Sequence, residues 1–181
     1  MRSCQSAVWV VVVSGILVSP LSGAAEPCSD FSWDVHQERA LFGSTGLPAV
    51  SGKGHDTAVP LLLDHLYNVQ LSPQTEVEFV AVPGKKVLGD GAYAGLAVFD
   101  IASPGTYRVS LDVPAWIDVV SSGQLVASRD FQGAHGCNAP RKIIAYEFQI
   151  AQHFVLQLSG ASSASVRVAI TRAPETKGSI K

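Results

Sequence analysis

The sequence predicts an all-β fold, an antiparallel β-sandwich or jelly roll of about nine strands with one short N-terminal helix. From Pro60 onward, short runs of alternating apolar and polar residues follow one another, and Gly, Pro, Ser or Asn separates most of them. No helical pattern lies between successive runs, which disfavours a parallel α/β sheet. About 155 residues remain after a leader is removed, enough for one domain with its own hydrophobic core.

The first residues have the layout of a secretory signal. Arg2 precedes an apolar run, AVWVVVVSGILV at residues 7–18, and the small residues SGAA follow at 22–25. This run is shorter than the roughly 20 residues of a spanning helix. We therefore expect residues 1–25 to be a cleaved signal peptide, residues 26–172 to be a single domain, and residues 173–181 to be a disordered tail. The mature protein is expected to be periplasmic or secreted, with no membrane span.

The charge balance of the expected mature chain is close to neutral. Residues 1–25 contain one arginine and no acidic residue, which leaves 12 Lys plus Arg against 15 Asp plus Glu and a formal charge of −3. Nucleic-acid binding would call for a basic patch or stripe. The composition provides none, so we expect no nucleic-acid partner.

The N-terminal helix is expected at about 34–42, within CSDFSWDVHQERALF. Asp34 and Gln37 have the spacing of a capping box, and Gly43 is a stop signal. The next residues, 43–57, are rich in Gly, Pro and Ser and predict an exposed loop.

The strands are expected where period-two patterns lie between turns. In the first pattern His65 shares the apolar set of Tyr67 and Val69, which predicts a buried or half-buried histidine. The expected strands cover 63–71, 77–81, 95–101, 107–111, 116–120, 124–128, 142–149, 154–158 and 166–170.

Two resemblances agree with this layout. The stretches SPGTYRVSLDV and HFVLQLSGASSASVRVAI are similar to the last strands of the bacterial pre-peptidase C-terminal type of β-sandwich. The mature layout, with CSDFSWDVHQERALF first and AWIDVV and CNAPRK later, resembles a group of uncharacterised exported bacterial proteins. Some members of that group carry a homogentisate 1,2-dioxygenase label, which implies an iron enzyme; the iron-binding motif of those larger cupin enzymes is not found in this sequence.

Two cysteines remain after the expected cleavage, Cys28 and Cys137. An exported protein meets an oxidising compartment, so a Cys28–Cys137 disulfide is the favoured interpretation. The alternatives are a thiol nucleophile with His135 as its base, or a metal site.

Histidine spacing gives little support to a metal centre. Zinc sites use paired spacings such as HExxH, and none occurs. The weak candidates are His36 and Glu38 with a distant histidine such as His135, but residues two apart on a helix point to nearly opposite faces. We expect no cofactor. A GxSxG nucleophile motif and a phosphate-binding loop are also not found.

The strongest binding hypothesis rests on PAWIDVV. Trp116 and Asp118 fall on one face of a strand, and Ile117 and Val119 on the other. A tryptophan beside a carboxylate suits sugar stacking, and Tyr93 in GDGAYAG extends the surface. The alternative is a buried tryptophan whose N–H finds a partner, while Asp118 bonds nearby backbone.

The sequence favours a non-catalytic binding or accessory domain of the cell envelope. Its partner would be a glycan, a small ligand or an envelope protein. The alternative is an enzyme, either a metal-dependent oxygenase, as the second resemblance implies, or a hydrolase.

Overall fold

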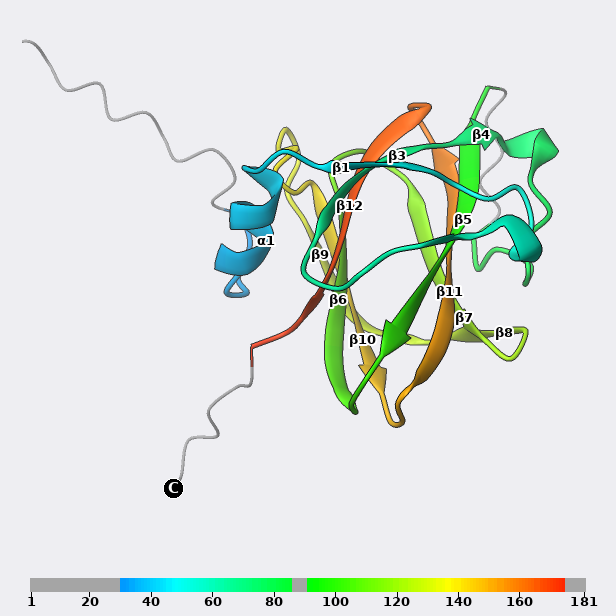
Figure 1. The fold of residues 1–181 in the computed structure, drawn as a ribbon. Helices are drawn as coiled ribbons and strands as arrows, with labels where there is room; N and C mark the ends of the chain where they lie inside the picture. The colour runs from blue at the N-terminus through cyan, green and yellow to red at the C-terminus, as the bar shows by residue number, and fades with distance from the viewer. Residues whose placement is uncertain (1–29, 86–90, 175–181) are drawn as a thin grey trace, which may run out of the picture.

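The computed structural model describes residues 30–85 and 91–174, and they form a β-sandwich with one α-helix. Two sheets face each other, and the short helix α1 (His36–Phe42) lies outside them (Figure 1). The predicted all-β class is confirmed. The described residues form twelve strands, more than the nine expected, because several short edge strands carry no alternating pattern.

The first sheet has the order β1-β3-β12-β6-β10-β9, and the second has the order β2-β5-β11-β7-β8, with β4 also paired to β5. Pairing is antiparallel except for β1 with β3 and β2 with β5. The strands of the first sheet are β1 (Leu47–Val50), β3 (Leu66–Gln70), β6 (Gly105–Leu111), β9 (Ser128–Gly133), β10 (Lys142–Phe148) and β12 (Ser165–Arg172). Those of the second are β2 (Val59–Pro60), β4 (Ser72–Pro73), β5 (Tyr93–Ile101), β7 (Trp116–Ser121), β8 (Gln124–Val126) and β11 (Gln152–Ala161).

The core lies between the two sheets and follows the period-two pattern. On β10, Ile144, Tyr146 and Phe148 all belong to the main apolar cluster, which also takes residues from β5, β7 and β11. Phe148 lies 4.2 Å from the Phe154 ring, centroid to centroid, so one strand of each sheet meets in an aromatic contact.

Helix α1 covers the outer face of the first sheet beside β12 (Figure 1). Phe42 packs there against Leu66 and Ala169, and Gly43 is the C-terminal cap, as predicted. The predicted capping box is wrong. Asp34 accepts from the His36 backbone N–H (3.1 Å), while the Gln37 side chain donates to Asp64 instead (2.6 Å), so tertiary contact replaces the local cap.

The expected loop at 43–57 contains β1 and a 3-10 turn, His55–Thr57. Strand β1 is an edge strand with mostly exposed side chains, so backbone pairing with β3 defines it and no apolar alternation marks it. The expected burial of His65 is also wrong: it lies before β3 and is exposed. Asp64, with φ of 60°, makes the turn that shifts the strand's start.

The expected strand at 77–81 is a non-strand segment that covers the outer face of the second sheet. Val77, Phe79 and Ala81 pack over a small cluster containing Leu96 and Val155. Buried Gln157 accepts from the Ala81 backbone N–H (3.0 Å) and donates to the Ala81 carbonyl (3.1 Å). One side chain thus replaces a strand partner, and the packing of the segment's apolar residues on the sheet explains the misleading pattern.

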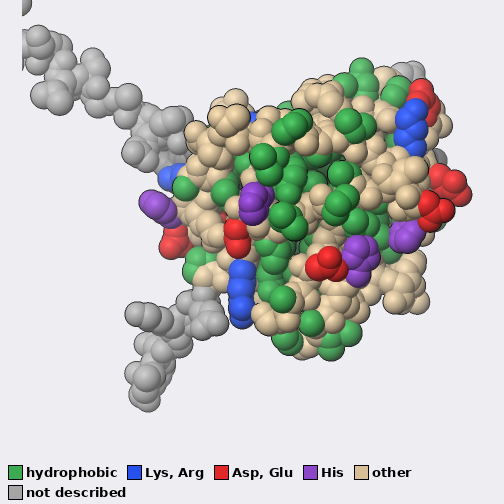
Figure 2. All heavy atoms as spheres, viewed as in Figure 1, with side chains coloured by type: hydrophobic (Ala, Val, Ile, Leu, Met, Phe, Trp, Pro, Cys, Tyr) green, Lys and Arg blue, Asp and Glu red, His purple; other side chains and the backbone are tan. Residues whose placement is uncertain are grey.

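The remaining expected strands are found with shifted ends, except that the one predicted over 124–128 is divided between β8 and β9, one in each sheet. The predicted signal peptide, Cys28 and most of the predicted tail lie outside the described residues. The part of the chain that is described includes no helix with the length and apolar character needed to cross a bilayer. Figure 2 shows charged side chains of both signs in small groups on one face, with apolar side chains between them.

Candidate functional site

Trp116 and Asp118 point to the same side of β7, as the sequence predicts. The Trp116 indole Nε1–H donates to Asp118 Oδ1 (2.9 Å), and the Gly84 backbone N–H donates to Asp118 Oδ2 (3.0 Å). Asp118 is buried and Trp116 half-buried, while Ile117 and Val119 point into the core. The indole N–H is therefore satisfied internally, as the alternative interpretation expects, yet part of the ring remains exposed.

Two adjoining cavities meet at Trp116, and together we call them the Trp116 cleft. Their volumes are about 380 Å³ and 450 Å³, within the range of small-molecule sites. Both are lined by Trp116, Phe131 and Lys142. The cleft lies at one end of the sandwich, where β7 and β8 of one sheet approach β9 and β10 of the other.

One side of the cleft is apolar. Phe131 pairs with Ile144 across β9 and β10, so it continues the inward face of the sheet at its edge, where β9 is the last strand among the described residues. Its side chain is 66% exposed, and Leu125 on β8 is 40% exposed. The remaining residues of this side are Ile117, Val126, Ala127, Ser128, Ile144 and Tyr146.

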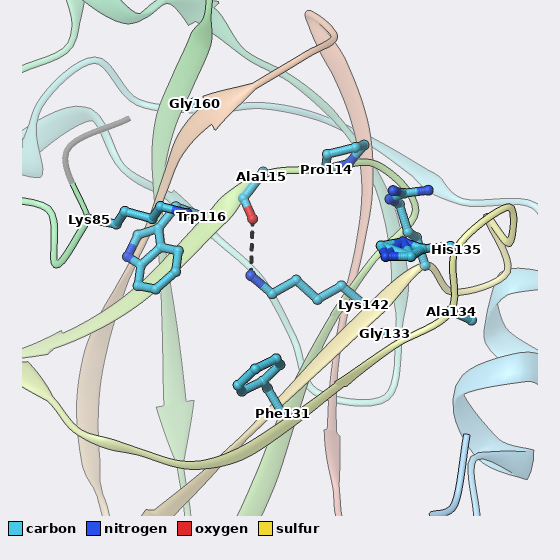
Figure 3. A pocket seen from close by; sticks show the side chains of 11 residues that line it. Lys85, Pro114, Ala115, Trp116, Phe131, Gly133, Ala134, His135, Lys142 and Gly160 are labelled. Atoms are coloured by element: carbon cyan, nitrogen blue, oxygen red, sulfur yellow. Dashed lines mark hydrogen bonds between the residues drawn. The ribbon is translucent and has the colours of Figure 1, made fainter. Parts of the chain in front are cut away.

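The other side carries cations. Figure 3 shows the Lys142 side chain extending across the opening toward the Ala115 carbonyl, which accepts from its ammonium (3.2 Å). The Nζ atoms of Lys142 and Lys85 lie 5.0 and 5.6 Å from the Trp116 ring centroid, which is cation–π range. Arg141 and His135 also line this side.

Lys142 is electrostatically unusual. Burial lowers the pKa of its ammonium, the charge of Lys85 lowers that pKa further, and Asp118 partly opposes both. Burial also raises the pKa of the Tyr146 hydroxyl, with a smaller contribution from Asp118. That hydroxyl donates to the Ile117 carbonyl (3.2 Å) and joins the two sheets beneath the cleft.

Tyr93 lies apart from these groups. It begins β5 rather than standing in a glycine-rich loop, and it packs half-buried against the main core. It does not line either cavity of the Trp116 cleft. The proposed extension of the surface by Tyr93 is therefore not seen.

His36 and Glu38 do not converge. His36 is exposed, whereas Glu38 is buried beneath α1, where Arg108 Nη1 (3.3 Å) and Thr171 Oγ1 (2.9 Å) donate to its Oε1. His135 lies elsewhere, in the Trp116 cleft. Over residues 30–85 and 91–174, no three His, Cys, Asp or Glu side chains stand close enough to hold a metal ion.

Cys137 is buried in the loop between β9 and β10, where the Ala139 backbone N–H donates to its Sγ (3.3 Å). Its predicted partner, Cys28, is outside the described residues, so the disulfide stays a prediction. Gly136, next to Cys137, has a φ of 83°, in the left-handed region that glycine adopts readily in turns.

Sequence reasoning did not identify Lys85, Phe131 and Lys142 as site residues. A signal for Lys142 exists in KIIAYEF, because a lysine there keeps phase with inward-facing Ile144 and Tyr146. Phe131 and Lys85 carry no such signal, since their positions depend on which strands and segments become neighbours.

Comparisons with known proteins add little. No protein-family model matches the sequence, and no curated protein is similar to it. Among solved structures, a selenomethionine-labelled β-glucosidase from Kluyveromyces marxianus is similar over 45% of this chain, at 13% identity and a TM-score of 0.31. The match covers 11% of that chain.

Proposed function

We propose that the chain is an exported, non-catalytic binding or accessory domain of the cell envelope that recognises a small ligand at the Trp116 cleft. The observation that carries this proposal is the cleft itself, where a half-buried tryptophan and a largely exposed phenylalanine face an opening with several polar groups. Concave, mostly apolar sites with a few fixed polar groups are the usual form of small-ligand sites.

The position of Trp116 favours recognition over a purely structural role. Asp118, which itself accepts from the Gly84 N–H, holds the indole in one orientation, and this reduces the entropy lost when a ligand packs against it. Phe131 is exposed on an edge strand, where a large apolar side chain costs solubility unless something covers it. A glycan or a flat aromatic molecule could pack against the Trp116 ring in this cleft.

Tryptophan fluorescence tests this proposal. The expected mature chain has two tryptophans, so Trp33→Phe leaves Trp116 as the single indole reporter. We expect saturable changes in its emission with at least one member of a panel of mono- and oligosaccharides, aromatic acids and fatty acids. The same ligand should bind the Trp116→Ala variant at least tenfold more weakly by calorimetry. Flat titrations across the panel would overturn the proposal.

The exported location is tested separately. Expression of the full-length sequence in a Gram-negative host should yield a periplasmic protein whose N-terminus begins near residue 25 or 26. A full-length protein retained in the cytoplasm would contradict it.

A further inference from the structure

The Trp116 cleft holds more positive charge than its own groups neutralise. Lys85, Arg141 and Lys142 line it, and Asp118 is the one carboxylate among the described lining residues. Both oxygens of Asp118 already accept hydrogen bonds, from Trp116 and from Gly84. The imbalance is local, because the full sequence has a formal charge of −2.

Lys142 is the residue at which the excess positive charge of the cleft is least compensated. Its alternation along β10 places it in the inward-facing set with Ile144 and Tyr146, at the mouth of the sandwich. An ammonium group has three N–H donors, and among residues 30–85 and 91–174 this one has a single hydrogen-bond acceptor, the Ala115 carbonyl. Burial and Lys85 both disfavour its charge and lower its pKa, with Asp118 in opposition, so an added anion beside the ammonium would stabilise the charged form.

The charged and apolar sides of the cleft meet at the same residue. Lys142 lines both cavities, so an anion beside its ammonium has the apolar cavity directly next to it. There the exposed Phe131 ring and Leu125 flank a space of about 450 Å³. In Figure 3 Phe131 and Trp116 stand on two sides of the Lys142 ammonium.

Gly133 keeps the opening beside Lys142 free. It pairs with Lys142 across β9 and β10, so a side chain at this position would share the inward face with the lysine. A Cβ placed there meets only the Arg141 carbonyl, at an ordinary contact distance of 3.5 Å. The backbone can thus accept a larger residue, which would occupy space in the cleft.

We propose that the ligand of the Trp116 cleft is an amphipathic organic carboxylate. Its carboxylate lies beside Lys142 and Lys85, and its aromatic or aliphatic body lies between Phe131 and Leu125. This inference rests on the proposed function and adds the chemical class of the ligand. A neutral sugar would leave the excess charge of the cleft uncompensated and would not use the apolar cavity.

Isothermal titration calorimetry with matched probes tests this class. The probes are phenylacetate and octanoate, together with their neutral isosteres phenylacetamide and octanamide. We expect at least one carboxylate to bind roughly ten- to hundredfold more tightly than its amide, the range for a lost hydrogen bond between charged groups. Acetate, which lacks the apolar body, should bind more weakly than either carboxylate.

Variants assign the binding to this cleft. Lys142→Met keeps the length of the side chain and removes one of the two cations beside the carboxylate, so it should markedly reduce the preference for carboxylate over amide. Gly133→Val should weaken both members of a pair, because it fills space without changing charge. Lys53→Met is the control: Lys53 is an exposed lysine paired with Glu76 outside the cleft, and its loss should leave both affinities unchanged. Near-UV circular dichroism of each variant checks that the fold is intact.

Each outcome decides between the two proposals. Equal affinity for acids and amides, with both lost in Gly133→Val, overturns the carboxylate class and leaves small-ligand binding intact. A carboxylate preference that is unchanged in Lys142→Met overturns the assignment to this cleft. Failure of every carboxylate to bind, while a sugar alters Trp116 fluorescence, overturns the inference but not the proposed function. If no probe binds in either the fluorescence titration or the calorimetry, the proposed function and the carboxylate class are both overturned.

Discussion

Replacing Glu38 with alanine tests how α1 is held on the sheet. The Glu38 side chain is 1% exposed and that of Arg108 is 10% exposed, so their ion pair is buried. Removing one partner of a buried pair costs about 3–5 kcal/mol, because the other charge is left without compensation. Arg108 also donates to the Asp34 carbonyl (2.6 Å) and lies 4.9 Å from the Trp33 ring centroid. These contacts still compensate part of the Arg108 charge when Glu38 is removed. We therefore expect a loss in the free energy of unfolding at the lower end of that range, about 3 kcal/mol.

Urea denaturation followed by circular dichroism measures this loss. A change of about 3 kcal/mol corresponds to roughly 6–12 °C in Tm for a domain of this size. The matched control is His36→Ala, on the exposed side of the same helix, which should change the free energy of unfolding by less than about 0.5 kcal/mol. The double variant Glu38→Leu with Arg108→Met should recover much of the loss, because it removes both charges.

A loss in Glu38→Ala no larger than that in His36→Ala would refute the reasoning. It would mean that the Glu38–Arg108 pair adds nothing beyond its desolvation cost, and that apolar contacts such as that of Phe42 with Leu66 hold the helix.

Three further predictions concern the disulfide, the covering segment and the core tyrosine. Peptide mapping of the exported protein should find Cys28 linked to Cys137, and reduction should lower the free energy of unfolding by about 4–5 kcal/mol on the chain-entropy account; alkylation of both thiols without reductant would exclude the link. Gln157→Leu removes the side-chain partner of the Ala81 N–H and carbonyl. It should therefore lower the free energy of unfolding by about 1–3 kcal/mol and speed hydrogen exchange of the Ala81 amide. Unchanged exchange at Ala81 would show that other contacts hold the segment. The raised pKa of Tyr146 means that the folded state favours the neutral phenol, so its stabilisation is complete below the usual pKa of 10.0 and declines as pH rises above it. In Tyr146→Phe that alkaline decline should be smaller, and an identical pH profile would contradict the assignment.

The central strands could be predicted from the sequence because apolar side chains face the core between the sheets. Both sheets bury their inner faces, so a strand such as β6 alternates in polarity along its length. The same rule separates Trp116 and Asp118 from the core-facing Ile117, and it holds in the structure.

The edges of the sandwich could not be predicted in this way. Strand β1 is defined by backbone pairing with β3, and its exposed Leu47 and Val50 give no pattern. The segment at 77–81 has a strand-like pattern because it packs on a sheet while Gln157, distant in sequence, satisfies its backbone. Local periodicity cannot distinguish these two cases, because the difference lies in a long-range partner.

The candidate site was found only in part for the same reason. Trp116 and Asp118 stand close in sequence, and their contact follows from strand geometry. Phe131 and Lys142 reach Trp116 from strands of the opposite sheet, so their convergence depends on how the two sheets meet at one end. Glu38 shows that closeness in sequence is not enough for a site. It is two residues from His36, yet its carboxylate forms an ion pair with Arg108 on the other side of the helix.

The most direct test of the central claim is an amide and indole nuclear magnetic resonance titration of the isotope-labelled mature protein with phenylacetate. If the Trp116 cleft is the ligand site, the largest shift changes will be those of the Trp116 indole N–H and the amides of Phe131, Gly133 and Lys142. Shifts concentrated elsewhere, for example around the hollow lined by Lys53 and Glu78, or no shifts with any probe of the panel, would contradict it.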